Sequence, residues 1–465
     1  MTDPDGNGSD GDGGARSADF ERVASRVRER VTPDSDERTR LDAAADALEA
    51  RVEDALSDLP IEADVLRVGS TARGTWLAGD RDIDLFVRFP PSLSREKLER
   101  YGLKVGRAVL PDGREEFAEH PYVTGAFDGF DVDLVPCYDV PTASDIRSAV
   151  DRTPFHNAYL QARLDDDIAG DVRTFKRFLK GIGAYGSDLR TRGFSGYLAE
   201  LLVLEHGGFE PLVAAAADWR PPVELDPEDH GRKSFDDPLV VVDPTDPERN
   251  VAAVLSAENV ARLQHYAREL LADPREELFF PPERPPLTEA AVGDRIAERG
   301  TAPVAVVLDA PDIVEDQLYP QLRKSLDGIA SELDRRGFAP LRAAAFADGR
   351  AVLFVELTVG SLPAVERHRG PPVAVRRHAS GFFAKYEDAD VYGPFLDGDR
   401  YAVEREREFR TAADFLRSDA LFDVALGARV ETRLRDGYRV LVGAEVATLA
   451  DEFGDELADY FDPRP

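Results

Sequence analysis

Two short segments alternate apolar residues with aspartates, and they constrain the fold more than any other feature of the chain. One is DIDLFVRF, which begins at Asp82, and the other is FDVDLVP, which begins at Phe130. Successive side chains of a β-strand point to opposite faces, so Asp82 shares a face with Asp84, and Asp131 with Asp133. If the two strands are neighbours, carboxylates from both gather on one face of a sheet. Because ionised carboxylates repel each other at short range, such a group requires a cation.

Mg²⁺ is the cation that this group would hold. It prefers carboxylate oxygens and completes its coordination with water and substrate phosphates. Together, Asp82, Asp84 and Asp133 could hold two metal ions about 3.5 to 4 Å apart, one activating a hydroxyl and the other steadying a triphosphate. The sequence therefore predicts metal-dependent chemistry on a phosphate, with Mg²⁺ as cofactor.

A glycine–serine turn with a nearby arginine precedes the first acidic strand. Gly69 and Ser70 offer a triphosphate backbone N–H groups and a hydroxyl, and Arg73 offers a fixed cation. The alternative is that each Asp-x-Asp is only the solvated face of an amphipathic strand. That alternative requires neither the turn nor a second acidic strand, so the combination favours nucleotidyl transfer.

The N-terminal part of the chain is predicted to mix helices and strands. Its first 18 residues, acidic and rich in glycine, are expected to form a disordered tail. Two helices follow at about 19–31 and 33–59, the second with Thr32 as cap and Pro33 as its first residue. Around the turn and the acidic segments, the expected elements are strands at 64–68, 83–89 and 130–135 and a short helix at 72–77.

The remainder of the chain changes character twice. From 156 to 271 the pattern is helical almost throughout, and the proline-rich stretch at 279–287 marks a boundary. Beyond it, strands and helices alternate in a way that indicates one or two α+β modules. No run of eighteen apolar residues and no secretion signal is present, and Cys137 is the single cysteine, so we expect a cytoplasmic protein without a membrane partner.

The charge balance at first argues against a nucleic-acid partner. The net charge is −32, from 90 acidic and 58 basic residues, and only seven of the basic residues are lysines. Acids spread along a lysine-poor chain are typical of proteins that are soluble in very high salt, where self-repulsion is screened. The net charge is therefore interpreted as an adaptation to a solvent with very high salt. It does not exclude a nucleic-acid partner, so local basic segments become informative.

Two basic segments stand out against this background. Residues 173–192 hold six basic residues and one acid, and residues 367–378 hold four arginines, two histidines and no acid. Phosphate is a natural partner for both, and aromatic residues follow the second segment, as suits exposed RNA bases. The alternatives are a solvated helix face for the first and a flexible loop held by salt bridges for the second.

The order of these motifs resembles a known superfamily. Gly-Ser, then Asp-x-Asp, then a later strand acid is similar to the signature of the polymerase-β-like nucleotidyltransferases. More narrowly, VGSTARGTWLAGDRDIDLF, VDLVPCY, RTPFHNAYL, LKGIGAYGSDLRTRGFSGYLAELL and DPTDPERNVAAVLS resemble, in order, blocks of the archaeal class I CCA-adding enzymes. The resemblance covers nearly the whole chain and shows no departure at a motif position.

The resemblance implies roles for individual residues. Asp82, Asp84 and Asp133 fall on the catalytic, metal-binding carboxylates of the family, while Asp131 is left as a neighbour. The nucleotide-binding positions are Ser70, Arg73, His156, Lys176, Tyr185 and Arg249, the last of which helps to read the base. The expected RNA contacts are Arg367, Arg369, Arg376 and Arg377.

The resemblance also implies an α+β multidomain architecture. Its expected parts are a nucleotidyltransferase head with a mixed sheet (19–155), a helical neck that recognises the base (156–275), a body (276–325 and 411–465) and a tail domain that binds tRNA (326–410). A homodimer is compatible with this resemblance.

The implied function is template-independent addition and repair of the 3′-terminal CCA of tRNA from CTP and ATP, with release of pyrophosphate. The RNA partner would be the tRNA 3′ end with its acceptor and TΨC arm. Two alternatives stay open at this point. One is a poly(A) polymerase or another terminal RNA nucleotidyltransferase, and the other is a non-catalytic RNA-binding protein that keeps the fold.

Overall fold

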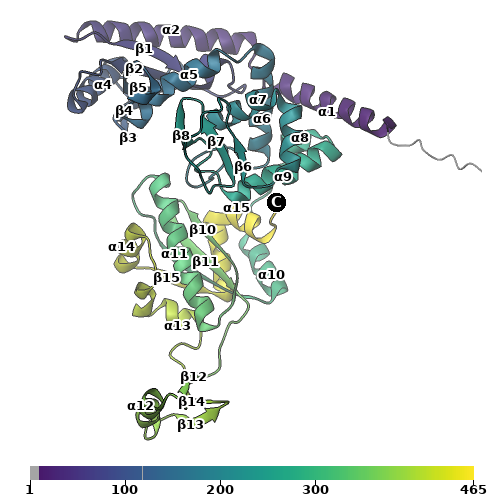
Figure 1. Ribbon diagram of the computed structural model, residues 1–465, viewed down its shortest axis with the longest axis vertical. Helices are drawn as coiled ribbons and strands as arrows, with labels where there is room; N and C mark the ends of the chain where they lie inside the picture. The colour runs from purple at the N-terminus through teal and green to yellow at the C-terminus, as the bar shows by residue number, and fades with distance from the viewer. Residues whose placement is uncertain (1–9, 118) are drawn as a thin grey trace, which may run out of the picture. The chain divides into compact units, whose positions relative to one another are not determined.

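The computed structural model describes residues 10–117 and 119–465, and the chain divides into two compact units, Met1–Pro282 and Glu283–Pro465 (Figure 1). Residues 1–9 of the expected disordered tail lie outside the described residues. Residues 10–18 form the start of helix α1 (Asp10–Val31), so for them the expectation of disorder is wrong. Their polar composition predicted disorder, but a polar composition does not exclude the backbone hydrogen bonds of a helix.

A mixed five-stranded sheet carries the two acidic strands. Its order is β1-β2-β5-β4-β3, and β2 runs parallel to β5 while the other pairs are antiparallel. The strands are β1 (Asp64–Val68), β2 (Asp82–Phe89), β3 (Arg114–Phe117), β4 (Pro121–Phe127) and β5 (Phe130–Tyr138). The mixed sheet expected for the head is confirmed.

Two helices pack on one face of this sheet. α2 (Ser35–Ser57) and α4 (Arg95–Val109) bury their apolar sides against strand residues such as Ile83. α2 begins two residues later than expected because Asp34 is its N-cap. The Glu37 backbone N–H donates to the Asp34 side chain, and the Asp34 backbone N–H donates to the Glu37 side chain. This reciprocal capping outweighs the preference of proline for the first helical position.

The rest of the first unit is mainly helical. Its helices are α3 (Gly69–Arg73), α5 (Thr153–Gln161), α6 (Asp166–Gly181), α7 (Gly196–His206), α8 (Phe209–Asp218) and α9 (Ala257–Ala272), with the 3₁₀ helices η1 (Ala143–Asp145), η2 (Ala149–Arg152) and η3 (Glu276–Leu278). One apolar core is shared by α1, α6, α7, α8 and α9.

A second, three-stranded sheet lies within this helical part. Its strands are β6 (Val223–Leu225), β7 (Leu239–Asp243) and β8 (Asp246–Asn250), in the order β6-β7-β8. The expectation that 156–271 is helical almost throughout is therefore corrected. β7 reads LVVVD between two prolines, and a short run of β-branched residues with such flanks is typical of a buried strand.

The second unit is built around an antiparallel sheet with the order β10-β11-β9-β15. α11, α13 and α14 share one core with this sheet, and α10, η5 and α15 share the other, so helices cover both faces (Figure 1). The elements are α10 (Glu289–Arg299), β9 (Ala302–Asp309), α11 (Glu315–Arg336), β10 (Pro340–Ala347), β11 (Arg350–Leu357), α13 (Ala412–Leu416), η4 (Asp419–Asp423), α14 (Ala428–Asp436), β15 (Arg439–Val442), η5 (Gly443–Leu449) and α15 (Ala450–Phe461).

A small separate sheet completes the second unit. It has the order β12-β14-β13, and its elements are β12 (Val365–Pro372), α12 (Arg376–Tyr386), β13 (Tyr392–Asp397) and β14 (Arg400–Glu406). The boundary expected at residue 326 lies inside α11, and the β10-β11 hairpin, expected in the tail, pairs with β9. Because backbone hydrogen bonds hold the hairpin in the larger sheet, the small sheet begins only at β12.

In the described part of the chain, no helix is both long and apolar enough to cross a membrane.

The close contact between α4 and β4 gives a first test of the packing. Gly106 of α4 lies so near β4 that a Cβ atom would be 2.7 Å from the Val123 Cβ, whereas nothing lies within 4 Å of a Cβ at Gly293 of α10. Alanine normally stabilises a helix interior relative to glycine. We expect Gly293→Ala to raise the free energy of unfolding by about 0.5–1 kcal/mol, and Gly106→Ala to lower it by about 1–3 kcal/mol. Denaturant unfolding measures both, and stabilisation by Gly106→Ala would contradict the packing.

Candidate active site

The two acidic strands are direct neighbours in the head sheet. In the parallel register of β2 and β5, Asp82 lies opposite Asp131 and Asp84 lies opposite Asp133. Ile83, between the first two acids, is fully buried under the helices on the opposite face. The alternation read from the sequence therefore gathers four carboxylates on one face, where no helix core covers them.

The carboxylates affect one another strongly. Burial, followed by the charges of Asp133 and Asp82, raises the pKa of Asp84 to about 6. Burial, followed by the charge of Asp80, also raises the pKa of Asp82. Among the described residues, none forms an ion pair or a side-chain hydrogen bond with Asp82, Asp84 or Asp133. Lys180 and Arg73 act on Asp82 and Asp84 only from beyond ion-pair distance, and their charges do not offset the burial and the mutual repulsion.

The Gly-Ser turn lies beside these carboxylates. Val68, the last residue of β1, is paired with Asp84, and α3 begins at the next residue. Gly69 has a φ of 78°, and a Cβ at this position would overlap the Asp84 carboxylate, so only glycine fits. The short helix expected at 72–77 instead spans the turn itself and ends at Gly74, whose left-handed conformation terminates it. Ser70 directly follows Gly69, the residue that lies against the Asp84 carboxylate.

A buried glutamate holds the two cations nearest to the turn. The Glu200 side chain, on α7, is fully buried, and it accepts hydrogen bonds from Arg73 Nη2 at 2.7 Å and from Lys176 Nζ at 3.1 Å. Thr75 donates to the same carboxylate. Burial opposes ionisation of Glu200, but Lys176 and Arg73 outweigh it and keep its pKa below the usual value. Both cations expected to contact the nucleotide are thus bound to one carboxylate.

A second buried carboxylate joins two further predicted residues. Asp243, at the end of β7, lies 2.8 Å from His156 Nε2 and 2.7 Å from Arg249 Nη1. The His156 ring also stacks on Tyr197, with ring centroids 4.0 Å apart. Burial opposes ionisation of Asp243, but hydrogen bonds from His156 and Thr245 hold its pKa far below the usual value. His156 and Arg249, 93 positions apart in sequence (249 − 156), therefore form one cluster.

One hydrogen bond links the two clusters. Arg73 Nη1 donates to Asn157 Oδ1 at 2.8 Å, and Asn157 follows His156 on α5. Tyr185 lies close to the same region, since Lys180 Nζ is 5.3 Å from its ring centroid and burial, followed by the charge of Glu200, raises its pKa. The structure therefore brings together the three carboxylates that were predicted to be catalytic and the six residues that were predicted to bind the nucleotide.

Four residues of this region escaped the sequence analysis: Asn157, Tyr197, Glu200 and Asp243. Glu200 carried a signal, because it is a single acid inside the apolar helix segment GYLAELLVL. An acid in such a position is buried and must find a positive partner. Asp243 carried a weaker one, since it ends the apolar run LVVV directly before a proline.

The basic segment 173–192 is used largely inside the protein. Arg173 donates to the carbonyl oxygen of Gly74, Arg177 donates to that of Phe279 at 2.7 Å, and Lys176 binds Glu200. From the sequence, phosphate was the expected partner of this segment, with a solvated helix face as the alternative. For these three, the partners that the structure shows are protein atoms.

The predicted RNA-binding arginines lie in the small sheet of the second unit. Arg367 and Arg369 on β12 both pair with Asp397, at 3.3 Å each. Arg376 and Arg377 are exposed in the first turn of α12, and neither has an ion-pair partner among the described residues. This segment is a strand followed by a helix and not a flexible loop.

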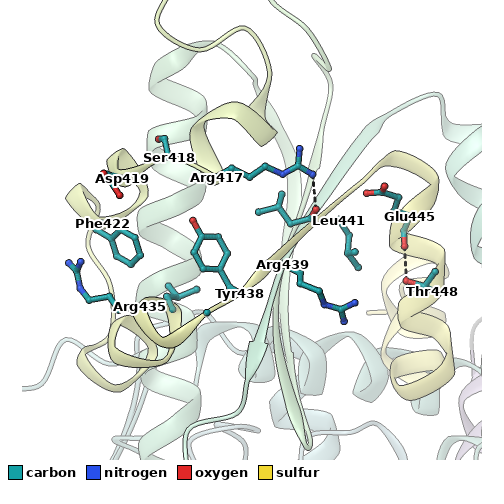
Figure 2. Close-up of a pocket in the computed structure, with 13 residues that line it drawn as sticks. Arg417, Ser418, Asp419, Phe422, Arg435, Tyr438, Arg439, Leu441, Glu445 and Thr448 are labelled. Atoms are coloured by element: carbon teal, nitrogen blue, oxygen red, sulfur yellow. Dashed lines mark hydrogen bonds between the residues drawn. The ribbon is translucent and has the colours of Figure 1, made fainter.

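Another arginine-rich surface lies at the open edge of β15 (Figure 2). A pocket of about 1070 Å³ is lined by three arginines and by the aromatic rings of Phe422 and Tyr438. Arg435 pairs with Glu431, whereas Arg417 and Arg439 have no ion-pair partner in the described part of the chain. Arg417 donates to the carbonyl oxygen of Val440 at 3.0 Å and so covers one exposed hydrogen-bonding group of the edge strand.

Metal binding requires that the carboxylates offer the ligand atoms that the metal ion prefers. No three carboxylate, histidine or cysteine side chains among the described residues already converge to enclose a metal ion. Mg²⁺, however, is usually bound by one or two carboxylates together with substrate phosphates and water. Asp82, Asp84 and Asp133 fit this donor set, because they are adjacent, offer carboxylate oxygens and have no ion-pair partner among the described residues.

Comparison with known proteins decides the family. Three family models match successive parts of the chain: Nucleotidyltransferase domain at 49–156, tRNA nucleotidyltransferase, second domain, at 170–280, and CCA-adding enzyme, C-terminal domain, at 299–443. The CCA-adding enzyme of Haloarcula marismortui is 62% identical over 97% of this chain and 100% of the relative. That of Halorubrum lacusprofundi is 62% identical over 96% of this chain and 100% of the relative.

The chain belongs to the CCA-adding enzymes.

Membership settles the function at this level. A CCA-adding enzyme is a CCA tRNA nucleotidyltransferase, and its substrates are tRNA and nucleoside triphosphates. The poly(A) polymerase and the non-catalytic RNA-binding protein are thereby set aside. Enzymes with this nucleotidyltransferase domain are typically metal-dependent, as the carboxylate group predicts.

Two of the solved structures that match resemble this chain only distantly. A structure of the Cid1 poly(U) polymerase with Mg 3′-dATP bound has a TM-score of 0.44 and 15% identity, over 56% of this chain and 98% of the other. The E. coli MS115-1 CdnC structure with ATP has a TM-score of 0.42 and 19% identity, over 56% and 94%. These matches carry no argument about activity.

Glu200 provides a test of the cluster that it holds together. Replacing Glu200 by glutamine leaves Arg73 and Lys176 without a balancing charge in a buried position. We expect Glu200→Gln to lower the free energy of unfolding by about 3–5 kcal/mol. Glu205→Gln, at an exposed position of the same helix, should change it by less than about 0.5 kcal/mol. Equal effects of the two changes in urea unfolding would contradict the described network.

Proposed function

We propose that this CCA tRNA nucleotidyltransferase catalyses addition at the Asp82, Asp84 and Asp133 carboxylates with Mg²⁺ as cofactor. The observation that carries the proposal is the parallel register of β2 and β5, which sets Asp84 opposite Asp133. The metal ions, when bound, would activate the attacking hydroxyl and stabilise charge on the phosphates. The three carboxylates are assigned to holding them, and Asp131 is assigned no ligand role.

The reaction joins one nucleotide at a time to tRNA. The 3′-hydroxyl attacks the α-phosphate of CTP or ATP, a phosphodiester bond forms, and the bond to pyrophosphate breaks, twice with CTP and once with ATP. In-line positioning of the two reactants contributes much of the rate in such reactions. No described side chain is needed as a covalent nucleophile.

The nucleotide contacts are proposed for two groups of residues. Ser70 and Arg73 lie beside Asp84 and are assigned to the triphosphate, with Lys176 and Tyr185 next to them. His156 and Arg249 share Asp243 and are assigned to the sugar and the base. A side chain that is already oriented by a buried carboxylate loses less conformational entropy on binding, which supports both assignments.

The tRNA contacts are proposed for Arg367, Arg369, Arg376 and Arg377. They would bind the acceptor and TΨC arm by its shape and phosphates, since one enzyme serves every tRNA. The roles given to the head, neck, body and tail, a cytoplasmic location and a homodimer belong to the same proposal, with the tail shortened to the small sheet that begins at β12.

The carboxylates are tested by single substitutions. Asp84→Asn and Asp133→Asn each remove one proposed metal ligand, and we expect incorporation of labelled CTP and ATP to fall by at least about a hundredfold, since even outer-shell changes cost tenfold to a hundredfold. Asp131→Asn is the matched control on the same face and should retain most activity. The assay uses a tRNA transcript that lacks its last three nucleotides, with Mg²⁺ in molar KCl, and a parallel sample with EDTA.

Three outcomes would contradict the proposal. Undiminished activity of Asp84→Asn or Asp133→Asn would remove these residues from catalysis, and activity in EDTA would remove the metal. A wild-type product longer than two C and one A would contradict the stated reaction.

The tail arginines are tested through binding. We expect the double change Arg376→Gln and Arg377→Gln to weaken tRNA binding and to reduce the slope of log K against log salt by about one for each phosphate that is no longer bound. The KM for CTP should stay unchanged, because these residues lie outside the proposed nucleotide contacts. Arg335→Gln, an exposed arginine of α11 that pairs with Glu332, is the control. An unchanged salt slope in the double variant would refute the assigned RNA contact.

A further inference from the structure

The register of the head sheet continues the row of carboxylates onto β4, on the side away from the Gly-Ser turn. Asp84 lies opposite Asp133, and Asp133 in turn lies opposite Thr124 of β4. Residues paired across a sheet have their side chains on the same face, so Thr124 lies beside Asp133 on the face of the carboxylates. Tyr122, two residues earlier, shares this face because successive side chains of a strand alternate. Two residues with hydroxyl groups thus lie next to the proposed metal site.

Both of these hydroxyls are available to a ligand. Tyr122 and Thr124 are half-buried, and no described residue forms a hydrogen bond with either side chain. Neither hydroxyl belongs to the fully enclosed polar atoms that have no partner, so both are accessible at the surface. The Tyr122 ring packs against the apolar cluster that includes Phe86 and Val135. A hydroxyl on a ring that is already held in place loses little conformational entropy when it binds.

The Tyr122 hydroxyl lies within reach of the charges of the carboxylates. Burial, followed by the charge of Asp133, raises the pKa of this hydroxyl, and Asp84 adds a smaller effect in the same direction. The hydroxyl therefore stays protonated at neutral pH, where it can both donate and accept a hydrogen bond.

The neighbouring strand β3 adds no net charge to this surface. Arg114 lies opposite Thr124, and Glu116 lies opposite Tyr122. The two β3 residues pair with each other, with Arg114 Nε 2.9 Å from Glu116 Oε1. A phosphate at this place would meet the negative charge of Asp133 without an unpaired cation to offset it. The surface therefore favours an uncharged polar group, such as the hydroxyls of a sugar.

The geometry of the proposed reaction brings a sugar to this side of the carboxylates. The Gly-Ser turn follows β1, and the sheet order β1-β2-β5-β4 places β4 on the other side of the two acidic strands. If the turn holds the triphosphate, the pyrophosphate leaves on the β1 side. Displacement at phosphorus is in line, so the attacking 3′-hydroxyl approaches from the opposite side, which is that of β4.

We propose that Tyr122 and Thr124 bind the ribose of the 3′-terminal tRNA nucleotide and hold its 3′-hydroxyl beside Asp133. Their hydroxyls would contact the 2′-hydroxyl, which donates and accepts hydrogen bonds and distinguishes RNA from DNA. The inference rests on the function proposed for the three carboxylates. It makes Tyr122 and Thr124 the residues that select a ribonucleotide end.

The experiment compares two tRNA transcripts that lack their last three nucleotides. One ends in a ribonucleotide and the other in a 2′-deoxynucleotide, and both keep the 3′-hydroxyl. For each transcript, kcat/KM is measured for addition of the first C, with Mg²⁺ in molar KCl. We expect the wild-type enzyme to prefer the ribonucleotide end, and the preference is expressed as the ratio of the two kcat/KM values.

Four variants test whether the two hydroxyls produce this ratio. Tyr122→Phe and Thr124→Val each remove one hydroxyl and keep the shape of the side chain, so both are expected to fold. Each should lower the ratio by roughly two- to tenfold, the loss of one hydrogen bond. Thr124→Ser keeps a hydroxyl and should keep the wild-type ratio. Tyr101→Phe, which removes a tyrosine hydroxyl from α4 on the opposite face of the sheet, should keep it as well.

Two comparisons separate a ribose contact from other effects. The 2′-hydroxyl also alters the reactivity of the neighbouring 3′-hydroxyl, but this effect is the same in every variant and cancels when ratios are compared. The KM for CTP should stay unchanged in all four variants, because the proposed nucleotide contacts lie on the other side of the carboxylates.

Two results would overturn the inference. One is a wild-type enzyme that uses both ends equally well, and the other is a wild-type ratio in both Tyr122→Phe and Thr124→Val. Failure of the underlying function shows in a different measurement, the undiminished activity of Asp84→Asn, whereas the ratios are compared among active enzymes only.

Discussion

The parallel pairing of β2 with β5 is the constraint on which the rest of the site depends. In a sheet with antiparallel neighbours on both sides, this one parallel pair sets Asp84 opposite Asp133 in the same register. A slip of one residue would turn one acid pair to the buried face, against α2 and α4, where no counter-charge is available. Burial of the apolar residues between the acids therefore determines the register of the two strands. The register in turn determines which carboxylates lie opposite each other.

Two buried carboxylates connect the turn and the strand β8 with the helices around them. Glu200 binds Arg73 of the turn and Lys176 of α6, and Asp243 binds His156 of α5 and Arg249 of β8. Each carboxylate is costly to bury alone and is stable only when its partners are in place. Electrostatic interactions thus couple the positions of the strands, the turn and the helices. The cations at the proposed nucleotide site are oriented in the absence of substrate.

The sequence alone predicted the parts of this site that depend on local pattern. Alternation in the two acidic segments identified both strands, and the turn at Gly69 was recognised by its glycine, although its helix was placed three residues too late. The β7 strand and the partners Glu200 and Asp243 were missed, since they depend on contacts between distant segments that periodicity does not report. The start of α2 was misplaced because a reciprocal side-chain cap outweighed a proline signal.

The distribution of arginines explains how so acidic a chain can serve an RNA substrate. Within the basic segment 173–192, Arg173 and Arg177 donate to protein carbonyls, so these two arginines are not counted toward phosphate binding. At the high salt that the lysine-poor, acidic composition indicates, the Debye length falls to about 3 Å, and repulsion between the acidic surface and RNA is screened. Only direct contacts then matter, so the proposed contacts of Arg376 and Arg377, exposed arginines without an acidic partner among the described residues, would outweigh the opposing net charge of −32.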